Sequence, residues 1–326
     1  ESVSPSQSAV RAHDGTTTGA TMKTAFGLVL LAAPSIGRAG RPSFARALAT
    51  AATSRSPSPS PPHRYYILRH GETDANASGR IQGSSDASRL TERGRAQAAE
   101  VAAAAFSGVV GGAVGTVFSA AYVSPLTRAR ETLSVVRELA GPGVLPPAER
   151  VLTDLREIDF YGWEGRDKAD LMAEFPDSYR AWKVGDSRNV VVEGRLPVVE
   201  VWERAASVWE VVRADAAAAA ARTSASASTS AENHPRAVDG SPGADGDGGG
   251  EGTPPPPPDT TPSTLLVCHG TLGQALLCAA FGRDETHFRL YEFPNCGLAE
   301  IVWHGDEKLA RSWRWHHPTP SELSSM

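Results

Sequence analysis

Residues 64–73, RYYILRHGET, place an apolar run directly before a charged and polar sequence that contains a glycine. The apolar part predicts a short buried strand, because a brief hydrophobic run that ends in polar residues and glycine is typical of strands in α/β proteins. Arg69 and His70 then stand at the carboxyl end of that strand, the edge at which open α/β sheets bind ligands. This stretch therefore predicts both an α/β fold and the place of a functional site within it.

The same pattern recurs far downstream, where residues 264–271, TLLVCHGT, join a second buried-type strand to His269 and Gly270. A single histidine after a strand is more often a packed or capping residue than a catalytic one. Two strands that both run into His-Gly, however, can bring two imidazoles together at one end of a sheet. The repeated pattern therefore favours a functional interpretation of His70 and His269.

A third predicted strand, residues 117–123, leads through Ser124-Pro125-Leu126 into a helix with Arg128 and Arg130 in its first turns. Basic residues at the start of a helix oppose the helix dipole, which prefers anions there. A bound anion that needs both cations explains this placement better than helix stability does. The segment therefore predicts an anion site.

Glu157 stands between Leu155 and Ile158, in an apolar neighbourhood. An acid in such surroundings is suited to proton transfer near neutral pH. The alternative is a surface acid paired with the adjacent Arg156, and without the other segments that alternative is the better interpretation.

The 326-residue chain divides by composition into parts that can and cannot form a core. Residues 1–62 hold six basic residues and two acidic ones among Ser, Ala, Thr and Pro, and residues 214–263 are almost entirely Ala, Ser, Thr, Gly, Pro and Asp. Neither segment has enough apolar surface to offset the entropy lost on ordering. The sequence predicts a disordered presequence, residues 1–62, and one domain, residues 63–326, interrupted by a disordered insert at 214–263.

The presequence combines two targeting signals. Residues 25–33 form an apolar run of the length of a signal-peptide core, and residues 38–55 are rich in Arg, Ser and Ala and free of acids, as in organelle transit peptides. A signal-like segment followed by a transit-like one predicts import into a plastid (chloroplast). A mitochondrial or simple chloroplast presequence, or a cytoplasmic protein with a misassigned start, are the alternatives.

Charge and cysteine content exclude several classes of function. The foldable part holds 24 basic and 28 acidic residues, without the basic surplus of a nucleic-acid-binding protein. No apolar run reaches the roughly 18 residues that a membrane span requires, so we expect no membrane partner. Cys268, Cys278 and Cys296 are odd in number and lack paired spacing, which argues against a disulfide framework or a structural zinc site.

Taken in order, these segments resemble the histidine phosphatase superfamily, also called the phosphoglycerate mutase-like family. The resemblance covers the foldable chain, and six motifs in the family's order are hard to obtain by chance. The motifs are Arg69–Thr73 with Asn76, Gly79–Gly83, Leu90–Gly94, Ser124–Ala129, Leu155–Glu157 with Gly162–Gly165, and His269-Gly270. The fold implied is a three-layer α/β/α sandwich with a mostly parallel central sheet, covered by helices over 91–106 and 199–213.

The resemblance implies a phosphoryl transfer that needs neither metal nor cofactor. His70 would be the nucleophile and form a phosphohistidine, because neutral imidazole can attack phosphorus at physiological pH. Arg69, Arg128 and His269 would bind the phosphoryl oxygens. Glu157 would protonate the leaving alcohol and then deprotonate water. The further substrate contacts implied are Asn76, Gln82, Gly83, Arg130 and Gly270.

The family contains both mutases and phosphatases. Mutases carry Arg-His-Tyr after the acid, whereas Glu157 is followed by Ile158 and Asp159, so the cationic contacts for a second acidic group are missing. This departure favours a phosphatase acting on a small phosphorylated metabolite. The alternatives are a cofactor-dependent phosphoglycerate mutase and a catalytically silent phospho-ligand binding module.

Longer stretches are similar to the plant and algal 2-carboxy-D-arabinitol-1-phosphatase group. They are residues 79–86, residues 155–161, and residues 273–277 with 295–297. The substrate of that group is a sugar-acid phosphate that inhibits Rubisco, which would fit a plastid presequence. Residues 268–271, CHGT, depart from the group, which more often has Ala-His-Asn there.

Overall fold

The computed structural model describes residues 62–106, 117–231, 261–305 and 307–317. The predicted presequence lies outside these ranges except for Pro62, which begins the first strand. The strands are β1 (Pro62–Arg69), β2 (Ala120–Val123), β3 (Arg150–Val151), β4 (Ser263–Cys268), β5 (Leu298–His304) and β6 (Ser312–His317). The α-helices are α1 (Asp74–Ala77), α2 (Glu92–Val101), α3 (Thr127–Leu139), α4 (Lys168–Glu174), α5 (Pro176–Val184), α6 (Pro197–Ala231) and α7 (Gly270–Ala280). Shorter helical turns are η1 (Ala102–Phe106), η2 (Thr153–Leu155), η3 (Tyr161–Trp163), η4 (Ser187–Asn189) and η5 (Glu285–His287).

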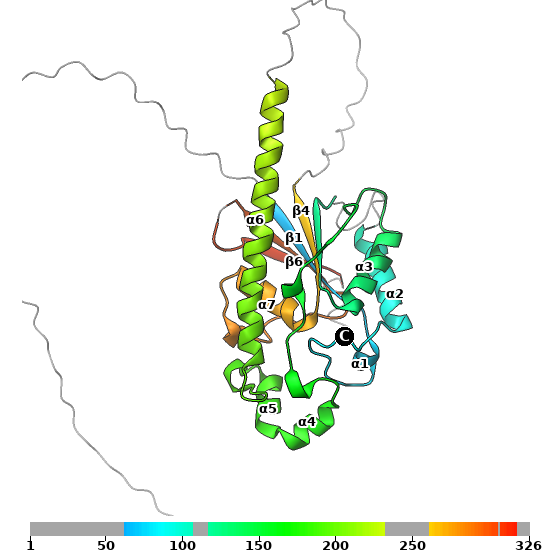
Figure 1. Ribbon diagram of the computed structural model, residues 1–326, viewed down its shortest axis with the longest axis vertical. Coiled ribbons are helices and arrows are strands. Elements are labelled where there is room, and N and C mark those ends of the chain that lie inside the picture. Colours follow the sequence, from blue (N-terminus) through cyan, green and yellow to red (C-terminus); the bar gives the residue numbers. More distant parts are fainter. Residues whose placement is uncertain (1–61, 107–116, 232–260, 306, 318–326) are drawn as a thin grey trace, which may run out of the picture. The chain divides into compact units, whose positions relative to one another are not determined.

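The described residues form one six-stranded sheet with the order β3-β2-β4-β1-β5-β6. The first four strands in this order are parallel, and β5 and β6 are added antiparallel at one edge. Helices lie on both faces of the sheet, with α6 and α7 on one and α2 and α3 on the other (Figure 1). The predicted three-layer α/β/α sandwich with a mostly parallel sheet is confirmed.

Two hydrophobic cores follow from the alternation of side chains along the strands. Tyr65 and Ile67 of β1 belong to the core beneath α6 and α7, whereas Tyr66 and Leu68 belong to the core beneath α2 and α3. All four side chains are buried, so β1 is apolar throughout its centre, as expected for a strand covered on both faces. The strand predicted at residues 64–68 therefore lies near the centre of the sheet.

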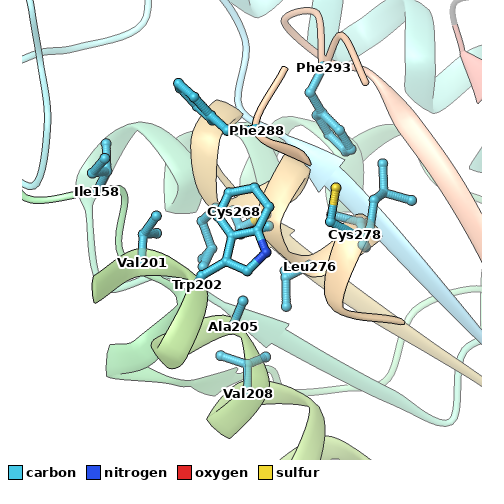
Figure 2. Packing of buried hydrophobic residues seen from close by; sticks show 14 of the residues in the cluster. Ile158, Val201, Trp202, Ala205, Val208, Cys268, Leu276, Cys278, Phe288 and Phe293 are labelled. Carbon is cyan, nitrogen blue, oxygen red and sulfur yellow. The ribbon is translucent and has the colours of Figure 1, made fainter. Parts of the chain in front are cut away.

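Helix α6 corrects the predicted extent of the disordered insert. Val201, Trp202, Ala205 and Val208 of this helix pack against α7 in the first core (Figure 2). The helix then continues to Ala231, so residues 214–231 are helical rather than disordered. Low apolar content excludes a core but not a helix, because alanine has the highest helix propensity and the packed part supplies the nucleus. Residues 232–260 lie outside the described residues.

Two other predicted boundaries also differ. The helix expected over 91–106 is α-helical to Val101 and continues as a π-helix, η1. The strand expected from Val117 begins at Ala120, which pairs with Thr264. Since β4 begins at Ser263, residues before Ala120 have little neighbouring strand to pair with, and Val117 is exposed.

The register of the parallel strands brings the predicted site residues to one edge. Arg69 pairs with Cys268, and Val123 pairs with Val267. His70, Ser124 and His269 therefore leave three adjacent strands at the same carboxyl edge. The helices α4 and α5 lie at that end of the domain (Figure 1).

None of the helices in the described part of the chain is long and apolar enough to cross a lipid bilayer.

Candidate active site

The imidazole rings of His70 and His269 lie side by side at the carboxyl edge of the sheet. Their centroids are 5.1 Å apart, and their planes are inclined by 59°. Both side chains are buried. The backbone N–H of His70 donates to the carbonyl oxygen of Cys268 at 3.1 Å, which ties the ends of β1 and β4 together. Two residues far apart in the chain thus share one site.

His70 presents one ring nitrogen as a nucleophile. Its Nδ1 lies 2.7 Å from the carbonyl oxygen of Gly71, and because a carbonyl only accepts, Nδ1 carries the proton. Burial, with the charges of Arg128 and Arg69, holds the pKa of His70 well below its ordinary value. The ring is therefore neutral at pH 7, with a lone pair on Nε2.

Arg128 is a fully buried cation at the start of α3. Its Nη1 and Nη2 donate to the carbonyl oxygens of Ser85 and Gly83, both at 2.8 Å. Burial lowers the pKa of Arg128 to about 10, so the guanidinium stays charged at neutral pH. Its Nε–H has no partner among the described residues. This cation has a spare donor for an anion.

Arg69 supplies a second cation from the end of β1. Its Nη1 donates to the carbonyl oxygen of Phe293 at 2.5 Å, while its buried Nε–H has no partner in the described part of the chain. A Cβ at Gly270 would lie only 3.2 Å from the Cζ of Arg69. The small residue after His269 therefore lets the guanidinium pack close to the start of α7.

His269 is oriented by Ser124, which belongs to the Ser124–Ala129 motif but was not predicted to contact the imidazole. Its Nε2 lies 2.7 Å from Oγ of Ser124, which also accepts from the backbone N–H of Leu126 at 3.3 Å. Burial and the nearby Arg128, His70 and Arg69 hold the pKa of His269 well below its ordinary value. Its Nδ1 is buried and has no partner among the described residues.

Backbone amides hold the carboxylate of Glu157. From the sequence we expected instead an apolar environment or an ion pair with Arg156. Oε1 of Glu157 accepts from the N–H groups of Ile158 at 2.9 Å and Leu272 at 3.0 Å, and its Oε2 accepts from Thr271 at 3.0 Å. Two of these amides belong to the first turn of α7, where backbone N–H groups have no carbonyl partner within the helix. Within the described residues no ion pair joins Glu157 to Arg156, so the surface-pair alternative is wrong.

A cavity of about 270 Å³ opens at this edge. Eight of the ten predicted site residues line it: Arg69, His70, Asn76, Gln82, Gly83, Arg128, Glu157 and Gly270. His269 lies buried beside His70 without lining the cavity.

Arg130 does not belong to this site. It is exposed and lines a different cavity, together with Glu131, Arg137 and Glu149. Successive residues of an α-helix are separated by about 100° around its axis, so two positions beyond Arg128 the side chain points away. The prediction that Arg130 contacts the substrate is therefore wrong, and the geometry of the helix explains why.

Three of the lining residues act in different ways. The side chain of Asn76 accepts from the N–H of Thr73 at 3.3 Å, so it closes the capping box of α1. Gln82 keeps a buried Oε1 with no partner in the described part of the chain. Gly83 has φ +57°, and a Cβ there would meet Oε1 of Glu164 at 2.1 Å, so any other residue would strain the backbone and displace the Glu164 side chain. Gly83 contributes its carbonyl oxygen to Arg128 rather than a side chain.

Four cations at the cavity were not predicted: Arg80, Lys168, Lys183 and Arg289. Burial, followed by the charges of Lys183, Arg69 and Arg289, lowers the pKa of Lys168. Within the described residues neither Lys168 nor Lys183 has an ion-pair partner. No local pattern marks these residues, because α4 and α5, which carry Lys168 and Lys183, reach the site only through the tertiary fold.

Arg289 is held in a strained backbone conformation, with φ +77°. Its guanidinium lies 4.2 Å from the ring centroid of Trp182, and its Nη2 donates to the carbonyl oxygen of that residue at 3.2 Å. The loop after η5 is thereby joined to α5, and a fixed cation faces the cavity.

Within the described ranges, no group of three or more His, Cys, Asp or Glu side chains is placed to hold a metal ion.

Three histidines with lowered pKa values predict acid-sensitive stability. Burial lowers the pKa of His63 to about 4, and the pKa values of His70 and His269 are also lowered. Below about pH 6.5 the unfolded chain binds protons that the folded protein does not, so stability is lost as pH falls. We expect the free energy of unfolding to fall between about pH 6.5 and pH 5 by up to about 1.4 kcal/mol per pH unit for each histidine.

Urea denaturation at both pH values, in phosphate-free buffer, measures this slope. His63→Gln should make the slope shallower, and the pH range lies above the titration of most carboxylates. A free energy of unfolding that stays constant across the range would contradict the prediction.

The chain matches a known protein family and several known proteins. Residues 65–224 and 257–316 match the histidine phosphatase superfamily (branch 1). The 2-carboxy-D-arabinitol-1-phosphatase of Triticum aestivum is 28% identical over 253 residues, which are 76% of this chain and 39% of that protein. The glucosyl-3-phosphoglycerate phosphatase of Mycobacterium tuberculosis is 38% identical over 144 residues, 42% of this chain and 58% of that protein. The chain spans less than two thirds of the length of either relative.

Solved structures show the same fold. The native structure of a mycobacterial glucosyl-3-phosphoglycerate phosphatase has a TM-score of 0.53 and 24% identity, covering 78% of this chain and 97% of that one. A phosphoserine phosphatase mutant from Entamoeba histolytica with phosphoserine has a TM-score of 0.52 and 17% identity, covering 78% and 98%. Because the family match extends over more than half of its residues, this chain belongs to the histidine phosphatase superfamily, branch 1.

Proposed function

We propose that this protein is a phosphatase that hydrolyses phosphomonoesters through a phosphohistidine intermediate. The observation that carries the proposal is the neutral imidazole of His70 in a cavity that also holds the guanidinium groups of Arg69 and Arg128. A phosphoryl group in transfer keeps negative charge on its equatorial oxygens, which fixed cations with spare donors stabilise. Nucleophile and cations are thus present together.

In the first step, the lone pair on Nε2 of His70 attacks phosphorus while the bond from phosphorus to the ester oxygen breaks. Glu157 lines the same cavity and would transfer its carboxyl proton to the departing oxygen. Arg69, Arg128 and Nδ1 of His269 would hold the phosphoryl oxygens throughout. The scheme uses no metal, since two guanidinium groups balance the charge.

In the second step, the carboxylate of Glu157 takes a proton from water, and the water oxygen attacks phosphorus. The bond from phosphorus to Nε2 breaks, and its electron pair returns to His70. Inorganic phosphate leaves. The carboxyl group of Glu157 is then protonated again for the next cycle.

The substrate we propose is a small sugar or sugar-acid phosphate such as 2-carboxy-D-arabinitol 1-phosphate. The relative from Triticum aestivum, a 2-carboxy-D-arabinitol-1-phosphatase, supports this class of substrate. The cations Lys168, Lys183 and Arg289 support it independently, because one phosphoryl group already engages Arg69 and Arg128. Further positive charge at the cavity suits a second acidic group on the substrate.

Mutases of this family carry cations directly after the acid to hold a second acidic group. In this chain Ile158, which is fully buried, and Asp159, whose carboxylate accepts from the N–H of Tyr161, stand there instead. We therefore place phosphatase before mutase. A silent phospho-ligand module is disfavoured, since His70 and Glu157 both line the cavity.

A substrate panel tests the proposal with the full chain. It compares 2-carboxy-D-arabinitol 1-phosphate, ribose 5-phosphate, 3-phosphoglycerate and p-nitrophenyl phosphate. We expect kcat/KM to be highest for the sugar-acid phosphate. The double variant Lys168→Ala/Lys183→Ala should raise KM for that substrate about tenfold, because each exposed cation contributes somewhat under about 1 kcal/mol to binding. KM for p-nitrophenyl phosphate should change less than about twofold.

Lys308→Ala is the matched control, because this lysine is exposed and does not line the cavity. Equal rates for the acidic and neutral sugar phosphates would overturn the preference for a sugar-acid phosphate. Interconversion of phosphoglycerate isomers would identify a mutase, and phosphate binding without turnover would identify a silent module. The plastid location expected from residues 1–62 stays a prediction.

A further inference from the structure

Arg204 of α6 hydrogen-bonds to the backbone of the segment that carries Glu157. Its Nη2 donates to two consecutive carbonyl oxygens, those of Arg156 at 3.1 Å and Glu157 at 2.8 Å. The Nε–H of Arg204 is buried and has no partner among the described residues. Arg204 does not line the cavity, so it reaches the reaction only through another residue.

The charge of Arg204 acts on the same acid. Burial lowers the pKa of Arg204, and the carboxylate of Glu157 is the leading charge that opposes this shift. The guanidinium of Arg204 and the carboxylate of Glu157 therefore attract each other. Glu157 is thus held from two elements, with α7 amides on its carboxylate and an α6 cation on its carbonyl group.

The segment that accepts hydrogen bonds from Arg204 is not part of a regular helix or strand. Residues 157–160 belong to neither a helix nor a strand. The neighbouring Ile158 is buried in the same core as Val201 of α6, one turn before Arg204 (Figure 2). Apolar packing holds the backbone against α6, and the guanidinium sets the direction of the two carbonyl groups. The planar fork of arginine is suited to this, whereas lysine would present a point charge.

We propose that Arg204 is a positioning residue that aligns Glu157 for proton transfer. This inference rests on the proposed function, in which Glu157 protonates the leaving oxygen. Proton transfer depends on placement, and a displacement of about 1 Å can cost on the order of 100-fold in rate. Arg204 would therefore matter most where the leaving group most needs a proton.

Leaving groups of different basicity separate this role from a merely structural one. An alkoxide leaves poorly without a proton, whereas p-nitrophenolate leaves without help. The value of kcat/KM reports the first step, in which the bond from phosphorus to oxygen breaks and the proton moves from Glu157. A misaligned acid therefore lowers kcat/KM for an alkyl phosphate and spares it for p-nitrophenyl phosphate.

The experiment measures both values of kcat/KM for the full chain and its variants, with glycerol 1-phosphate as the alkyl ester unless the panel above yields a better one. Arg204→Met should lower kcat/KM about 30- to 100-fold for the alkyl phosphate and less than about threefold for p-nitrophenyl phosphate. Arg204→Lys should lie between the wild type and this variant. Release of p-nitrophenol by Arg204→Met should show an initial burst, because the phosphoenzyme accumulates. The misaligned Glu157 must also deprotonate the water that attacks phosphohistidine in the second step.

Arg213→Met is the matched control. Arg213 stands on the same helix and also donates through Nη2 to a backbone carbonyl oxygen, that of Glu307 at 2.6 Å, but it does not contact the Glu157 segment. We expect the ratio of the two kcat/KM values to be unchanged in this variant. A change in ratio there as large as in Arg204→Met would show a general effect of α6 and overturn the proposal.

A double variant gives the decisive comparison. If Arg204 acts through Glu157, adding Arg204→Met to Glu157→Gln should leave the leaving-group ratio where Glu157→Gln alone puts it. Equal loss for both substrates in Arg204→Met and in the folded Arg204→Lys variant would reduce Arg204 to a structural residue. Absence of hydrolysis by the wild type would instead refute the proposed function, so the two failures are distinguishable.

Discussion

Replacing His70 with alanine should abolish the release of phosphate, with kcat falling by on the order of 10⁴-fold or more. The reason is that Nε2 of His70 is the nucleophile of the proposed first step, and its Nδ1 proton is held by the carbonyl oxygen of Gly71. With no imidazole at this position, only the cations of the cavity remain to promote attack by water. Phosphate release measured against the substrate panel gives the size of the loss.

The phosphohistidine itself is the second readout. Wild-type protein quenched during turnover of radiolabelled substrate should retain an acid-labile phosphoryl group, and His70→Ala should retain none. His63→Ala serves as the control, because His63 is a partly buried histidine that stands at the opposite end of β1. Full activity in His70→Ala, or labelling of that variant, would disprove the assigned nucleophile.

Replacing Glu157 with glutamine should produce a loss that depends on the leaving group. We expect kcat/KM to fall by about 10²- to 10⁴-fold for an alkyl phosphate, the range for loss of a general acid, and far less for p-nitrophenyl phosphate. Glutamine keeps the size of the side chain, but its amide nitrogen cannot accept from the N–H groups at the start of α7. Rates with esters of graded leaving-group basicity measure the effect.

Glu164→Gln is the control for this variant. Glu164 also accepts from backbone N–H groups, those of Ser84 at 2.7 Å and Phe160 at 3.1 Å, but it does not line the cavity. Its substitution can weaken the fold without changing the dependence on the leaving group. A uniform loss across all esters in Glu157→Gln would contradict the role of Glu157 as the proton donor.

The central strands could be predicted because their signals are local. A buried parallel strand is apolar along its length, so β1 and β4 stand out as short runs that end in Arg69 and Cys268. The shared carboxyl edge of parallel strands then places His70 near His269 without any knowledge of the intervening chain. The family also followed from these motifs, and the match to the histidine phosphatase superfamily confirms it.

Other features could not be predicted because they depend on contacts between distant segments. Arg128 and Arg130 both stand in the first turns of one predicted helix, but the rotation of α3 buries the first and exposes the second. The surroundings of Glu157 are set by the start of α7, a long way down the chain, rather than by its apolar neighbours. Local composition is a poor guide to such contacts.

By itself, the amino-acid sequence determined the sheet-forming segments, the family and the pairing of two histidines with two arginines, because short motifs and hydrophobic runs encode them locally. Only the tertiary structure decided that Lys168, Lys183 and Arg289 face the cavity and that Arg204 grips the segment of Glu157. The physical reason is that these cations, on α4, α5, a loop and α6, carry no positional signal in the sequence. Their positions follow from how α4, α5 and α6 pack against the rest of the domain.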